Sequence, residues 1–114
     1  MVKEINLKKI SPNELIQKFE DSSDGFGIEL HRKLHGGKRD LDWIFYSEKI
    51  SWCYNQIKEQ ESYVIEAQSL GDNQRAELSL ELVDFYYEVI EQLKIKYDQS
   101  MKFYKYVNAS KVIN

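Results

Sequence analysis

Five carboxylates recur at helical spacing in the second half of the chain. The stretch ELSLELVDFYYEVIEQL, residues 77–93, places them four, three, four and three residues apart, at Glu77, Glu81, Asp84, Glu88 and Glu91. On a helix this spacing gives one straight acidic line, and the stretch contains no Lys or Arg. Opposite charges at i,i+4 stabilise a helix by roughly 0.2–0.5 kcal/mol, and like charges cost about as much. The line is therefore mildly unfavourable for the helix that carries it.

Two interpretations of this line stay open. It is either the solvated face of an amphipathic helix or a recognition face for a basic partner. Residues 59–91 contain nine carboxylates and only one basic side chain, Arg75, for a net charge of −8, so the rest of the chain carries +5. Such a segment would steer a basic protein toward it. Carboxylates about 5–6 Å apart could also occupy a groove that holds a phosphate backbone. We expect Glu59 and Glu66 to belong to the same binding region.

A metal-dependent reaction is the third possibility. The pair Glu81-x-x-Asp84 resembles half of the signature of the all-α nucleoside-triphosphate pyrophosphatases, in which acidic pairs on two facing helices hold magnesium. The resemblance covers four residues and implies a second pair of the form EExxE. The most similar segment, EQESYVIE at residues 59–66, does not match EExxE, because Glu59, Glu61 and Glu66 have other spacings. No ExxH motif supports a di-iron site. We therefore expect no catalytic residues, no metal and no cofactor.

The stretch HRKLHGGKR, residues 31–39, is the one basic cluster. His31 and His35 are four residues apart and could present two imidazoles to a metal, but no third ligand is indicated. Cations before a Gly-Gly pair are typical of a helix C-terminus, and a phosphate contact stays open. Cys53 falls at a core position and is expected to pack as a small hydrophobic side chain.

Length and composition indicate one domain. With 114 residues, one proline and one cysteine, the chain suits long helices and has no disulfide framework. The first residues, MVKEINLKKIS, are charged and lack the apolar core of a secretory signal, and no apolar run approaches ~18 residues. We expect a cytoplasmic protein without a membrane span.

The N-terminal third is expected to form short elements. Residues 1–10 read as an arm or a short strand, and residues 11–37 as short helices. Ser11, Pro12 and Glu14 give a capping box with proline in the first turn, which predicts a helix to about Glu20. The following segment, FGIELHRKLH, can be a helix or a strand because its apolar spacing fits both periods.

Two long helices follow, at about 41–70 and 73–107. Asp40 is expected to be the N-cap of the first, and Gly71-Asp72 separates the two. Apolar residues recur at heptad positions a and d: Trp43, Tyr46, Ile50, Cys53, Ile57, Val64 and Ala67, then Val83, Tyr86, Ile90, Leu93, Tyr97, Tyr104 and Val107. The short turn makes the helices antiparallel. The residues after Val107 are expected to fray.

The expected fold is an all-α helical bundle built on a long antiparallel helical hairpin with one or two short N-terminal helices. Additional apolar residues lie outside the seam, at Ile44, Phe45, Trp52, Leu78, Leu82, Phe85 and Val89. One set can be covered by the N-terminal segments and the other by a partner, so the pattern is compatible with a homodimer. The leading hypothesis is a small non-enzymatic protein that neutralises a basic, nucleic-acid-handling protein, such as a nuclease or toxin, without binding nucleic acid itself. Immunity proteins, antitoxin-like proteins and phage-encoded inhibitors of defence nucleases are classes of protein that would act in this way. A structural or adaptor subunit is the alternative.

Overall fold

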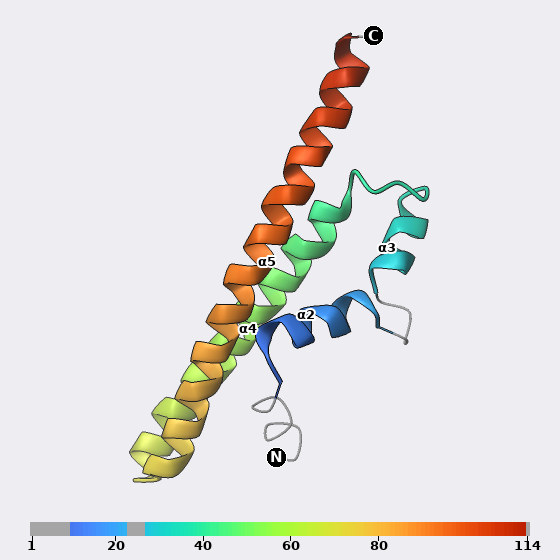
Figure 1. Cartoon of the computed structure of the whole chain (residues 1–114). Coiled ribbons are helices and arrows are strands. Elements are labelled where there is room, and N and C mark those ends of the chain that lie inside the picture. The colour runs from blue at the N-terminus through green and yellow to red at the C-terminus, as the bar shows by residue number, and fades with distance from the viewer. Residues whose placement is uncertain (1–9, 23–26, 114) are drawn as a thin grey trace.

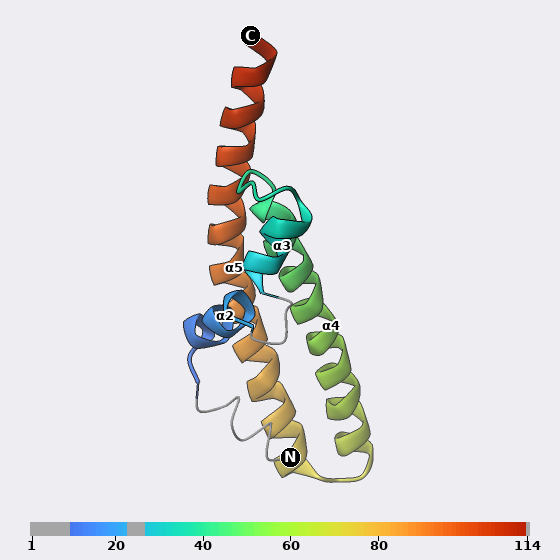
Figure 2. The same ribbon diagram turned by 90° about the vertical axis from the view of Figure 1, so that its right-hand side faces the viewer.

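The computed structural model describes residues 10–22 and 27–113, with side chains through Ala109, and within them the chain is helical. Its helices are α2 (Pro12–Glu20), α3 (Ile28–Leu34), α4 (Asp42–Ser69) and α5 (Asn73–Ile113). The two long helices pack against each other as an antiparallel pair, and α2 and α3 lie across one side of that pair (Figures 1 and 2). The predicted all-α hairpin bundle is confirmed. The arm or strand expected at 1–10 lies outside the described residues, except for Ile10, which packs against the core.

Helix α2 begins as the sequence predicts. The Ser11 hydroxyl accepts a hydrogen bond from the Glu14 backbone N–H over 3.2 Å, and the Glu14 carboxylate accepts one from the Ser11 N–H over 3.4 Å. This capping box satisfies two of the backbone donors left unpaired at a helix start. The helix then buries Leu15 and Ile16, which fasten it to the hairpin.

The segment with the ambiguous period is helical in the structure. Gly27 stands at the start of α3, where a Cβ atom would lie 2.6 Å from the Glu20 carbonyl oxygen, so the close approach of the two short helices requires glycine there. Gly36, with a φ of +80°, ends the helix in a conformation that side chains disfavour. The predicted glycine stop is therefore confirmed.

The predicted cap at the start of α4 is wrong. The helix begins at Asp42 with Leu41 in the N-cap position and no side-chain cap. Asp40 is instead only 7% exposed, and its Oδ1 atom has no hydrogen-bond partner among the described residues. The Asp42 carboxylate is bound by Arg32 of α3, and this tertiary contact anchors the helix start.

The seam of the hairpin follows the predicted heptads. Tyr46, Cys53, Ile57, Val64 and Ala67 of α4 are buried, as are Val83, Tyr86, Ile90 and Leu93 of α5. The turn passes through Gly71, with a φ of +74°. Gln60 of α4 occupies a heptad position of the same seam, where it is buried and its Oε1 atom lacks a hydrogen-bond partner in the described structure.

Helix α5 is longer than predicted. It continues to Ile113 instead of ending near Val107. The prediction that the helix frays after Val107 is therefore wrong for residues 108–113. Trp43, in the first turn of α4, packs against Tyr97 and Tyr104. The remainder of α5 extends past the start of α4 (Figure 1). The loop before α4 lines a hollow with Phe103 and Val107 of this part of α5.

The N-terminal helices pack against members of both sets of additional apolar residues. Phe45 of α4 and Leu82 and Val89 of α5 belong to one buried cluster with Leu15, Ile16 and Ile28. Phe19 of α2 packs edge-on against Trp52 of α4, with ring centroids 5.4 Å apart. No partner chain is therefore needed to cover Phe45, Leu82 and Val89.

Candidate protein-binding surface

The five carboxylates of α5, named here the acidic row, all point away from the seam. Each of them is exposed: Glu77, Glu81, Asp84, Glu88 and Glu91. Because Val83, Tyr86, Ile90 and Leu93 are buried against α4, the opposite face of α5 is turned outward. The hairpin thus presents the acidic row as one line along a rigid helix.

One end of the acidic row lies beside the start of α2. Pro12 and Asn13 line a hollow of about 340 Å³ together with Glu88, Glu91 and Gln92. A helix N-terminus carries a partial positive charge of roughly half an elementary charge. This charge offsets part of the repulsion at this end of the row. The sequence could not show it, because α2 and this part of α5 are far apart in the chain.

Two half-exposed apolar side chains border the acidic row. Leu80 is 47% and Tyr87 46% exposed, and each directly precedes a carboxylate of the row. Both occupy the same heptad position, so they form a second line parallel to the first. Apolar and aromatic side chains beside charged ones are typical of protein-binding surfaces.

Glu59 and Glu66 do not join this surface. Both are exposed, but they lie on outer positions of α4, whose buried seam residues face α5. Outer faces of two helices that share a seam point in different directions. Glu59 also accepts a hydrogen bond from the Tyr63 hydroxyl over 2.9 Å. The five carboxylates of the acidic row thus share one face of α5, and Glu59 and Glu66 lie on α4.

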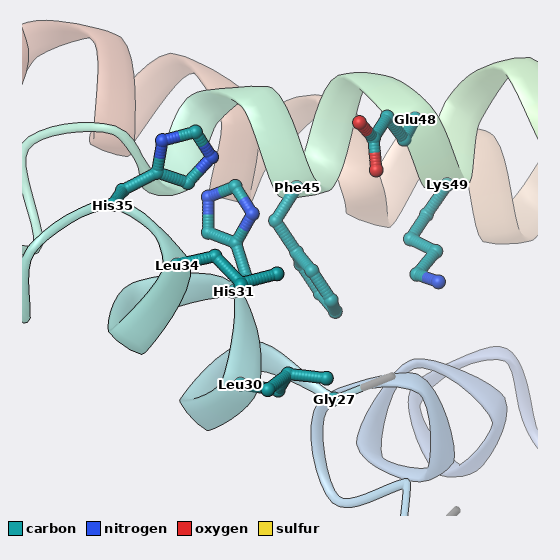
Figure 3. A pocket seen from close by; sticks show the side chains of 8 residues that line it. All are labelled: Gly27, Leu30, His31, Leu34, His35, Phe45, Glu48 and Lys49. Atoms are coloured by element: carbon teal, nitrogen blue, oxygen red, sulfur yellow. The ribbon is translucent and has the colours of Figure 1, made fainter. Parts of the chain in front are cut away.

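The histidine-containing segment is tied into the fold. The Nε2 atom of His31 lies 2.8 Å from the Leu41 carbonyl oxygen, so this ring nitrogen donates to the backbone. The ring centroids of His31 and His35 are 4.5 Å apart. They line a hollow of about 200 Å³ beside Phe45 and Lys49 (Figure 3), which is smaller than the pockets that usually hold small ligands. The arrangement supports a packing role.

Two partly buried ion pairs that the sequence does not indicate attach the short helices to the hairpin. Arg32 of α3 binds the Asp42 carboxylate, with Nη2 2.8 Å from Oδ2 and Nε 3.1 Å from Oδ1. This hydrogen bond raises the pKa of Arg32. Glu20 of α2 lies close to both long helices, where it accepts hydrogen bonds from Tyr46 and Lys96.

Cys53 is inaccessible in the seam, as its core position predicts. It has no exposed surface, and burial raises the pKa of its thiol to about 12. A thiol that stays protonated near neutral pH is a poor nucleophile. Its burial therefore fits a packing role.

A metal site finds no support in the described part of the chain. Residues 10–22 and 27–113 contain no group of three or more His, Cys, Asp or Glu side chains placed to hold a metal ion. Glu81 and Asp84 thus lack the second acidic pair that the pyrophosphatase resemblance implies. The long helices α4 and α5, like the other described helices, contain no apolar stretch able to cross a bilayer.

Comparison of the chain with protein-family models, with curated proteins and with solved structures found no similar protein.

Proposed function

We propose that the protein is a small, non-enzymatic binding protein of the cytoplasm that occludes a basic, nucleic-acid-handling protein through the acidic row. The observation that supports this most is the exposure of all five carboxylates along one face of α5. The hydrophobic seam explains why they point outward. It does not explain why a stretch of this length contains no basic residue.

The spacing of the acidic row suits a partner that binds phosphates. Successive carboxylates on one helical face lie about 5–6 Å apart, so a groove lined by Lys and Arg could receive the row in place of a nucleic-acid backbone. The hairpin holds the row in a fixed geometry, which lowers the entropy cost of binding. Immunity proteins, antitoxin-like proteins and phage-encoded inhibitors of defence nucleases are the classes that would use such a surface.

The apolar side chains beside the acidic row supply a second kind of contact. Charge complementarity mainly raises association rates and selects the partner, whereas buried aromatic and aliphatic side chains contribute most of the binding energy in many interfaces. Leu80 and Tyr87 could provide that contribution next to Glu81 and Glu88. A partner would then combine a basic groove with an apolar rim.

The test is affinity capture from the source organism with matched variants. Asp84→Lys/Glu88→Lys reverses two charges within the acidic row, and Asp21→Lys/Glu48→Lys reverses two exposed charges outside it, one at the C-cap of α2 and one on α4. The lysate is treated with nuclease so that nucleic acid cannot bridge proteins. We expect wild type and the control to retain the same basic protein and the row variant to lose it. Retention by all three proteins would contradict the proposal.

A second measurement tests occlusion itself. Single-stranded DNA is added to the captured complex at constant ionic strength. If the acidic row occupies a nucleic-acid groove, DNA displaces the protein from its partner. A complex that binds DNA without releasing the protein would show that the row contacts another surface.

A further inference from the structure

The acidic row is only the first half of a longer exposed line on α5. Steps of four and three residues continue beyond Glu91 to a further set of side chains, all exposed: Ile95, Asp98, Lys102, Lys105 and Ala109. The same face of one helix therefore carries five carboxylates in its first half, and in its second half one carboxylate, Asp98, followed by two lysines, Lys102 and Lys105. Ile95, 52% exposed, lies near the change of sign.

The basic half of this line has little cover within its own chain. It lies toward the end of α5 that extends beyond the start of α4 (Figures 1 and 2). Phe103 and Tyr106 on this part of α5 are 46% and 73% exposed. Exposed aromatic side chains next to lysines favour a partner that is both apolar and acidic.

We infer that two copies of this chain associate in antiparallel orientation through this face of α5. Because both helices carry the same line, antiparallel pairing places the acidic half of each copy against the basic half of the other. With the twofold axis between Lys96 and Tyr97, Glu91 faces Lys102 of the second copy, Glu88 faces Lys105, and Ile95 faces Asp98. Parallel pairing would place like charges together, which is unfavourable.

The size of the contact predicts a weak, salt-sensitive dimer. A single helix face buries less area than the roughly 800 Å² per partner of a standard interface, and pairs of exposed charges are screened above ~0.1 M salt. The dimer uses Glu88 and Glu91 of the acidic row, but its charge pairing requires no basic partner protein and so does not rest on the proposed function.

Sedimentation velocity and light scattering measure the dimer without any other protein. At low salt and high protein concentration we expect a mass near twice 13.6 kDa, which decreases toward the monomer mass as salt is added. A monomer at every concentration, or a dimer that salt does not affect, would overturn the inference.

Charge-swapped variants test the orientation. Glu88→Lys/Glu91→Lys makes all four residues of the named pairs basic, and Lys102→Glu/Lys105→Glu makes all four acidic, so each variant alone should be monomeric. An equimolar mixture should form a mixed dimer because opposite charges meet again at both ends. The control Asp21→Lys/Glu48→Lys should dimerise like wild type. Two monomeric variants that stay monomeric when mixed would refute the antiparallel arrangement.

A zero-length carbodiimide crosslink between Glu91 and Lys102 gives an independent readout. Within one helix these residues are about 16 Å apart along the axis, which is too far for an amide bond between their side chains. We expect this crosslink in the dimer band and not in the monomer band. Its absence from the dimer band would place the interface elsewhere. The crosslink is measured on this protein alone, so the result stays the same even if the proposed binding to a basic protein is wrong.

Discussion

The carboxylate of Glu20 accepts a hydrogen bond from the hydroxyl of Tyr46 over 2.5 Å. The same carboxylate oxygen lies 2.9 Å from Lys96 Nζ. Since Glu20 ends α2, Tyr46 lies on α4 and Lys96 on α5, one side chain joins three helices. The Glu20 side chain is only 13% exposed, so water replaces these contacts poorly. This junction fixes α2 across the hairpin and thereby its N-terminus beside the acidic row.

Replacement of Glu20 by alanine should destabilise the protein. The change leaves the buried Tyr46 hydroxyl and the Lys96 ammonium without their acceptor, and hydrogen bonds to charged groups contribute about 1.5–3 kcal/mol. We expect a loss of roughly 2 kcal/mol in the free energy of unfolding, measured by urea denaturation and circular dichroism. Glu48→Ala, at an exposed site, is the control and should change it by less than about 0.5 kcal/mol. Equal effects of both changes would contradict the role of the junction.

Stability should fall at alkaline pH because of Tyr46. Burial, together with the hydrogen bond to Glu20, raises the pKa of Tyr46 above its ordinary value of 10.0. The folded state therefore keeps this proton when the unfolded state loses it, and the free energy of unfolding decreases as pH rises above about 10. Tyr46→Phe should show a smaller decrease between pH 9 and 11, whereas Tyr87→Phe, at an exposed site, should follow wild type. A Tyr46→Phe profile identical to wild type would be inconsistent with the raised pKa.

The seam contains one polar residue whose replacement should stabilise the fold. Gln60 is 7% exposed and its Oε1 atom has no hydrogen-bond partner among the described residues. An unsatisfied buried acceptor costs about 1–3 kcal/mol, so we expect Gln60→Leu to raise the free energy of unfolding by roughly 1 kcal/mol. Gln68→Leu, exposed on the same helix, should have little effect. A destabilised Gln60→Leu variant would indicate that the amide specifies the register of the two helices.

Much of the fold could be predicted from the sequence because the signals are local and repeated. The heptads of α4 and α5 identify the seam, and Ser11, Pro12 and Glu14 identify the start of α2. The full length of α5 could also be predicted, because the sequence given contains no glycine or proline after Gly71 and thus no strong signal for a helix end. Continuing the four-three spacing past Glu91 would likewise have shown Lys102 and Lys105.

Other features depend on contacts between distant segments. The period of Ile28, Leu30 and Leu34 does not distinguish a helix from a strand, and packing decides for the helix. Asp40 and Asp42 are both suitable caps by residue type, but only Asp42 meets Arg32. The closeness of Glu88 and Glu91 to the start of α2 has no local signal at all. These are the contacts that place the short helices beside the acidic row.

The thiol of Cys53 should react only when the hairpin opens. It is fully buried with a pKa raised to about 12, so Ellman's reagent at pH 8 should modify it slowly in the native protein and rapidly in urea. Because the protein contains no other cysteine, the reaction reports this site alone. A rapid native reaction would show that the seam is open in solution.

The dissociation constant for the captured basic protein tests the acidic row most directly. It is measured for wild type, Asp84→Lys/Glu88→Lys and Asp21→Lys/Glu48→Lys at one salt concentration, with helicity checked by circular dichroism. We expect the row variant to bind at least about 30-fold more weakly, or about 2 kcal/mol, and the control to stay within about threefold of wild type. A row variant that binds as tightly as the control would show that the five carboxylates form only a solvated face.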